Sequence, residues 1–345
     1  DFLRMKETIR TASRNEKQLI KILETDVHRE NARLKESNTK LRSENNELIN
    51  DYNSLVDGYN SLQEENKTLK AYIGDLRNGM IDEEDIQFIK MIGDSIAIHE
   101  DQLRRVMEKA GYSASYTSKK LNKLRRNGYI TRWKCRLEHD VEEKIKPPAP
   151  FTLGVAGYII LTEFYPQQRF TRPESWNRYA EATLQRYVSL NELRTSFAEL
   201  RILRDWKWNV GVDYNRHIPV VSAVSKLETP KGYVHFLIER AQMGQNFVGY
   251  LTSKLRKWQQ SYEQHGEFKL NRLEDIKVPV VVIYCSTMAM AEHIQKEVML
   301  DVYPFTIWVC VEEDYEEHGD FSRSFYQVKD EKLTPITVSF LKPEK

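Results

Sequence analysis

The 345-residue sequence has few cysteines, no long apolar run and almost no net charge, and each absence excludes a class of protein. Cys135, Cys285 and Cys310 form no pair at metal-ligand spacing, so we expect neither a disulfide nor a zinc site. No stretch approaches the roughly 18 apolar residues of a membrane helix, which predicts a cytoplasmic protein without a membrane partner. Phosphate-binding and dinucleotide motifs are also missing, so we expect no cofactor. The chain begins with Asp1, and we expect further residues upstream.

The charge is balanced overall but not along the chain. There are 52 basic and 51 acidic residues, yet the segment from Arg104 to Arg136 holds eleven basic residues and one acid, Glu108. A local excess of this kind is typical of a surface that meets a polyanion.

A heptad repeat near the N-terminus predicts a leucine zipper over residues 1–80. Apolar residues recur at every seventh position, and taking these as d positions places asparagines such as Asn45 at a. Such asparagines favour a parallel, in-register homodimer. The alternative is a long helix lying along its own C-terminal domain. The expected dimer interface comprises Leu34, Leu41, Asn45, Leu48, Leu55, Leu62, Leu69 and Leu76.

Residues 81–140 have the element order of a winged helix-turn-helix. Helices are expected over 100–110 and 113–127 on either side of Gly111, followed by a strand over 129–135. In such a domain the second helix enters the major groove of DNA and the wing reaches the backbone. The alternative is a winged helix that docks a protein. The expected DNA-binding residues are Ser113, Ser115, Thr117, Lys119, Lys120, Lys123, Arg126, Arg132 and Lys134.

Prolines after this segment predict a linker over 141–150, and the remaining residues, 151–345, predict an α/β domain. Strands are expected over 217–227, 232–238, 278–285 and 306–311, and helices within 173–203, 247–262 and 288–300. The acidic run over 312–317 is expected to be a solvated loop. The fold class is therefore α plus α/β, with a coiled coil, a winged helix and an α/β domain.

Three short segments carry a resemblance to a known family. They are Ile218-Pro219-Val220-Val221, a strand that ends in Glu239, and a helix that carries Lys254-Leu255-Arg256-Lys257-Trp258. Together with the preceding winged helix, their order resembles the plasmid replication-relaxation family over roughly residues 82–300. The resemblance implies a restriction-endonuclease-like α/β domain and a role in plasmid or mobile-element replication, relaxation or transfer.

The nuclease chemistry of that domain is expected to be degenerate. Val220 stands where the family pattern has Asp, and Ala241 stands where a second acid is expected, which leaves Glu239 and Lys254 as remnants. A single carboxylate is a poor magnesium site. The alternative is a Mg²⁺-dependent nuclease that uses Glu239 with another acid, such as Asp213 or Glu228.

The sequence therefore predicts a homodimer that binds a two-fold site on double-stranded DNA and contacts a replication or transfer protein. One alternative is the nuclease, and another is a transcriptional regulator whose C-terminal domain is a sensor.

Overall fold

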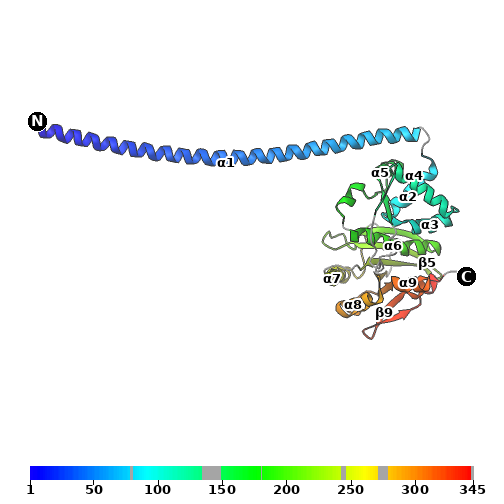
Figure 1. The fold of residues 1–345 in the computed structure, drawn as a ribbon. Coiled ribbons are helices and arrows are strands. Elements are labelled where there is room, and N and C mark those ends of the chain that lie inside the picture. Colours follow the sequence, from blue (N-terminus) through cyan, green and yellow to red (C-terminus); the bar gives the residue numbers. More distant parts are fainter. Residues whose placement is uncertain (78–80, 134–148, 180, 242–245, 271–278, 343–345) are drawn as a thin grey trace. The chain divides into compact units, whose positions relative to one another are not determined.

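The computed structural model describes the chain except residues 78–80, 134–148, 180, 242–245, 271–278 and 343–345, and it also leaves out the side chains of 65–66, 68–77 and 181 (Figure 1). The described chain divides into two compact units, Asp1–Gly74 and Asp75–Lys345.

Nearly all of the first unit belongs to one helix, α1 (Phe2–Arg77), which has 76 residues and continues to Arg77. No proline precedes Pro147 in the sequence, so nothing in this segment removes a backbone donor or blocks a helical turn. The helix expected over most of residues 1–80 is therefore confirmed, whereas its pairing with a second copy stays a prediction.

The second unit begins with a small domain of helices and short strands. Its elements are α2 (Glu83–Ser95), β1 (Ile98–His99), α3 (Glu100–Lys109), α4 (Ala114–Arg126), β2 (Ile130–Arg132), β3 (Pro150–Leu153) and α5 (Val155–Phe164). The strands form an antiparallel sheet in the order β1-β3-β2. Helix α5 passes very close to the chain before β2, where a Cβ on Gly157 would lie 2.2 Å from the carbonyl oxygen of Tyr129.

This sheet corrects the expected linker over 141–150. Pro150 is the first residue of β3, and Arg132 of β2 pairs with Phe151. Proline has no N–H to donate, and here it lies at the start of the strand, where that loss is tolerated. The small domain therefore continues to α5, while residues 141–148 lie outside the described part of the chain.

The rest of the second unit is built on a mixed seven-stranded sheet in the order β10-β9-β8-β7-β6-β5-β4. The central strands β6, β7 and β8 are parallel, and the flanking pairs are antiparallel. The strands are β4 (Leu203–Val210), β5 (Val221–Thr229), β6 (Gly232–Arg240), β7 (Val280–Cys285), β8 (Ile307–Val311), β9 (Phe325–Lys329) and β10 (Lys332–Ile336).

Helices cover both faces of this sheet. Two of them, α7 (Phe247–His265) and α8 (Met288–Val298), lie on one face, and α6 (Glu181–Glu199) lies on the other (Figure 1). Strand β7 is buried on both sides, since Val281 and Ile283 belong to one core cluster and Val282 and Tyr284 to the other. The mixed α/β fold is therefore confirmed.

Some elements differ from expectation. The acidic run forms a helix, α9 (Glu312–His318), which ends at Gly319 in the left-handed conformation. Short 3-10 helices lie at Pro173–Asn177, Leu300–Val302, Phe321–Arg323 and Ser339–Leu341. Strands β4, β9 and β10 and helix α5 were not expected from the sequence.

Helix α6 joins the small domain to the large sheet. Gln102 of α3 donates to the carbonyl oxygen of Val188 at 2.9 Å and to Glu192 at 2.9 Å. The amide of Asn191 donates to the carbonyl oxygens of Ser95 and Ala97, at 2.8 and 2.7 Å. Because these polar contacts are buried or partly buried, they fix the orientation of the small domain on the sheet.

Candidate nucleic-acid interface

Helix α4 is the central element of the candidate interface. Its N-cap is Ser113, whose side chain accepts a hydrogen bond from the backbone N–H of Tyr116. Gly111 makes the preceding turn with a φ of +94°, a conformation that strongly favours glycine. The helix ends in a basic turn, which suits the negative end of the helix dipole.

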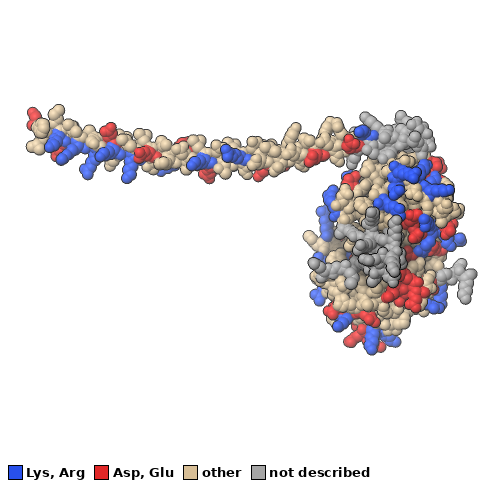
Figure 2. Space-filling model, in the orientation of Figure 1, with Lys and Arg blue, Asp and Glu red and all other residues tan. Residues whose placement is uncertain are grey.

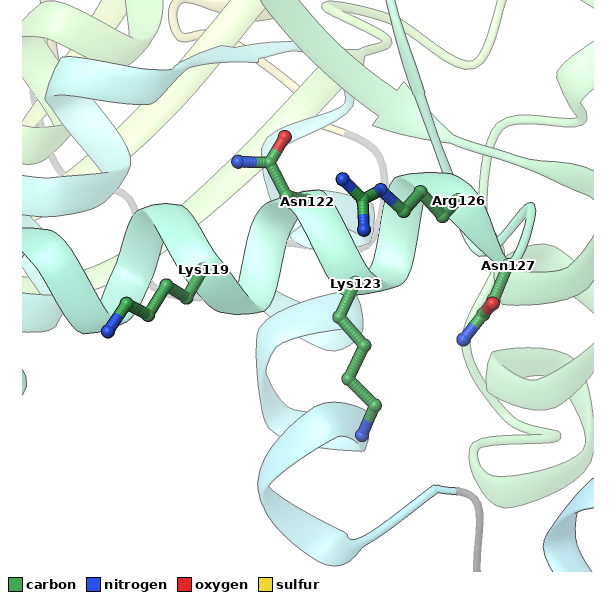
Figure 3. A pocket seen from close by; sticks show the side chains of 5 residues that line it. All are labelled: Lys119, Asn122, Lys123, Arg126 and Asn127. Atoms are coloured by element: carbon green, nitrogen blue, oxygen red, sulfur yellow. The ribbon is translucent and has the colours of Figure 1, made fainter.

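The outer face of α4 is exposed and carries positive charge without an acid. We define this outer face as Ser115, Lys119, Asn122, Arg125 and Arg126, all of which are exposed. Lys119, Arg125 and Arg126 make no ion pair with any residue that the structure describes. Lys119, Asn122, Lys123, Arg126 and Asn127 line a hollow of about 490 Å³ (Figure 3). In that view Lys119 and Lys123 extend to one side of the helix, and Asn122 and Arg126 lie at the other.

Two other lysines of α4, Lys120 on the opposite, inner face and Lys123 at the edge between the two faces, are paired with acids at the start of α2. The Lys120 ammonium lies 2.8 Å from Asp85, 2.7 Å from Glu84 and 3.2 Å from Asp82, and Lys123 lies 2.5 Å from Asp85. Burial alone would lower the pKa of Lys120, but its hydrogen bonds to these acids outweigh burial and raise the pKa. Hydrogen bonds from Lys120 and Tyr116 lower the pKa of Glu84. The inner face is therefore part of the domain's own structure.

This arrangement corrects two of the predicted DNA contacts. Thr117 is fully buried and Lys120 is 8% exposed, so neither side chain is available to a groove. Lys123 is half-buried and shared with Asp85, whereas Ser113, Ser115, Lys119 and Arg126 remain accessible. Asn122 and Arg125 are not among the predicted DNA contacts, although their helical spacing from Lys119 and Arg126 places them on the outer face.

The basic residues of α3 are also used internally. Arg104 pairs with Glu100 at 2.6 Å and donates to Ser118. Arg105 pairs with Glu199 at 2.6 Å and with Glu192, and these contacts raise its pKa although burial opposes the shift. Figure 2 shows Lys and Arg gathered over the α3 and α4 region and Asp and Glu near α9, but only part of that positive charge is free.

The predicted wing residues are described only in part. Arg132 is exposed, lies 3.9 Å from Glu100 and stacks over the ring of Phe151. Trp133 donates from its indole nitrogen to Thr152 at 2.8 Å and contacts Trp176, so its ring packs inward. Lys134 lies outside the described residues.

The remnant nuclease residues Glu239 and Lys254 meet in the core of the large sheet. The Lys254 ammonium lies 2.5 Å from one carboxylate oxygen of Glu239, and the other oxygen accepts from the backbone and hydroxyl of Ser222. Both charged side chains are 3 to 4% exposed. Both oxygens of Glu239 therefore already have partners, which suits a structural ion pair better than a metal ligand.

The other acids proposed for a nuclease site lie elsewhere. Asp213 accepts from Ser261 at 2.7 Å and lies 3.5 Å from His265. Glu228 forms an ion pair with Arg204 and lies opposite Tyr233 on β6. It is six residues along β5 from Ser222, the residue that donates a hydrogen bond to Glu239. Within the described residues, no group of three or more His, Cys, Asp or Glu side chains could hold a metal ion.

The leucine face of α1 is exposed along the described part of the helix. Leu34, Leu41, Leu48, Leu55 and Leu62 are between 59% and 75% exposed, and Asn45 is exposed on the neighbouring turn. Leu69 and Leu76 belong to the helix, but their side chains are not described. None of the helices in the described residues is both long and apolar enough to cross a bilayer.

Comparisons with family models, curated proteins and solved structures give no match to this chain. The resemblance to the replication-relaxation family therefore stays a prediction from the residues named above.

Proposed function

We propose that this protein binds double-stranded DNA through the outer face of α4. The observation that carries the proposal is the division of charge on α4. Acids at the start of α2 neutralise Lys120 and Lys123, whereas Lys119, Arg125 and Arg126 project from an exposed face with the neutral hydrogen-bonding groups of Ser115 and Asn122. Basic side chains suit phosphates, and an asparagine amide suits the edge of an adenine base.

The order of elements around α4 supports the same proposal. A helix, a short strand, two helices and two antiparallel strands are the arrangement of a winged helix, in which the second helix of the helix-turn-helix pair enters the major groove. In this chain that helix is α4, and its outer face is the one turned away from α2.

We propose that α1 pairs with the α1 of a second copy in a parallel coiled coil. A single α1 helix would leave its leucine face exposed to water, which is unfavourable. A second copy supplies the matching leucines and a-position asparagines. A dimer presents two outer faces, which suits a two-fold DNA site.

The biological setting rests on the resemblance alone. We propose a role as an accessory factor in plasmid or mobile-element replication, relaxation or transfer, with the large sheet as a platform for a partner protein. The buried Glu239–Lys254 pair supports a structural role for the remnant nuclease residues.

The test is DNA affinity measured by fluorescence anisotropy with a labelled duplex. Replacing Lys119 and Arg126 with alanine should weaken binding at least tenfold, because two phosphate-binding side chains are lost from each protomer. The matched control replaces the exposed Arg256 and Lys296, on α7 and α8, with alanine and should leave affinity unchanged. Equal affinities for both variants would contradict the proposal.

A further inference from the structure

A second candidate site lies between the small domain and the large sheet. It is a cleft of about 1230 Å³ lined by α2, by residues 167–171 after α5, by α6, and by β4 with the loop that follows it. This volume exceeds the range of roughly 300–1,000 Å³ that is typical of small-molecule sites. Such sites commonly form where domains meet.

The free charge in this cleft is positive. Its acids already have partners, since Asp94 lies 2.5 Å from Lys90, Asp205 lies 3.4 Å from Lys207, and Asp213 accepts from Ser261. In contrast, Arg169, Arg194 and Arg216 line the cleft and make no ion pair with any described residue. An anion would therefore be attracted into the cleft.

Arg194 is the innermost of these cations. Its Nη1 donates to the hydroxyl of Ser95 at 2.7 Å and to the side-chain oxygen of Asn191 at 3.3 Å. Its Nε and Nη2 make no hydrogen bond to a described residue. Burial lowers the pKa of Arg194, and the neighbouring Asp94 opposes this shift only in part. A partly buried guanidinium with free donors and no ion pair to a described residue is suited to a bidentate contact with phosphate or carboxylate.

A strained turn lies beside Arg194 in the wall of the cleft. Ile96 has a φ of 62° and a ψ of −58°, and Ala97 donates to the carbonyl oxygen of Ser95 at 2.7 Å. These values describe a classic γ-turn, which is rare and is especially unfavourable for a β-branched residue. The amide of Asn191 holds the carbonyl groups on both sides of Ile96. Strain that is held in place by buried contacts is characteristic of ligand sites.

We propose that this cleft binds a small organic anion, with Arg194 contacting its phosphate or carboxylate group and Arg169 and Arg216 contacting it from the rim. Trp206, Trp208 and Phe170 supply apolar wall for the organic part of the ligand. The site is independent of DNA binding, because it uses none of the outer-face residues of α4.

The experiment is isothermal titration of the full chain with ATP as the phosphate probe, citrate as the carboxylate probe and adenosine as an uncharged control. We expect ATP or citrate to bind with a Kd below about 1 mM and adenosine not to bind. Arg194→Gln should weaken binding at least tenfold, Arg169→Ala and Arg216→Ala severalfold, and Arg256→Ala not at all.

Arg194→Gln could lower the thermal midpoint so far that the protein does not fold. In that case Arg169→Ala and Arg216→Ala test the proposal, because both side chains are exposed and their loss should not unfold the protein. Absence of binding by both anions at 10 mM, or binding that Arg169→Ala and Arg216→Ala leave unchanged, would overturn the proposal. Binding of a short single-stranded oligonucleotide but of neither small anion would also overturn it.

Discussion

The two faces of α4 have similar residues but different surroundings. Lys120 on the inner face is surrounded by three carboxylates of the α2 segment, while Lys119, the preceding residue, faces solvent. Adjacent residues on a helix point about 100° apart, so one step along the sequence separates a structural lysine from a candidate DNA contact. The comparison shows that a count of basic residues overstates a binding surface unless the acids that face it are also known.

The largest effect should come from disrupting the coiled-coil dimer, because each protomer then binds DNA with a single outer face. Changing Leu41, Leu48 and Leu55 to glutamate places like charges along the seam, so analytical ultracentrifugation should show monomers. DNA affinity should fall at least about 100-fold because each monomer brings only one outer face.

The matched control changes Ser43 and Asn50 to glutamate, at positions on the far side of the helix from the seam. It should remain dimeric and bind DNA normally. A dimer that persists in the triple leucine variant would place the interface in the second unit.

The next largest effect should be a loss of stability when Lys120 of the inner face is replaced. Lys120→Met should lower the free energy of unfolding by about 2 to 3 kcal/mol, because it leaves the buried Asp85 with Lys123 as its remaining lysine. Denaturant unfolding measures the loss. Lys119→Met is the matched control and should change stability by less than about 0.5 kcal/mol. Equal losses for the two variants would remove the distinction between the faces.

A smaller effect should appear in acid. The pKa of Glu84 is lowered in the folded state, so the stability from its contacts is fully present above its ordinary pKa of 4.5 and is lost as pH falls through the lower, folded value. The stability difference between the wild-type protein and Lys120→Met should therefore shrink below pH 4.5. A difference that stays constant with pH would show that the carboxylates do not depend on Lys120.

The sequence was most informative where structure depends on local periodicity. The seven-residue repeat predicts α1, and runs of β-branched and aromatic residues predict most of β5 to β8. Strand β4 has a less regular pattern, with Arg204, Lys207 and Asn209 exposed between more buried residues and a register shift between Leu203 and Asp205.

Two of the errors concern contacts between distant segments, and a third concerns a local signal. The burial of Lys120 depends on acids 35 to 38 residues away, which no local pattern reveals. Pro150 was assigned to a linker because of the neighbouring prolines, although its strand is completed by pairing with β1 and β2. The acidic run was assigned to a loop, yet acids in its first turn and Gly319 at its end are helix signals.

The salt dependence of DNA binding tests the central claim most directly. Each phosphate contact contributes about 0.9 to the slope of log K against log salt, so a dimer that loses both Lys119 and Arg126 loses up to about 3.6 from the slope. We predict that Lys119→Ala with Arg126→Ala flattens the slope by about 2 to 3.6, whereas Lys120→Met leaves it unchanged under conditions where the protein is folded. A slope that is unchanged in the outer-face variant, or flattened equally by Lys120→Met, would contradict the assignment of DNA binding to the outer face.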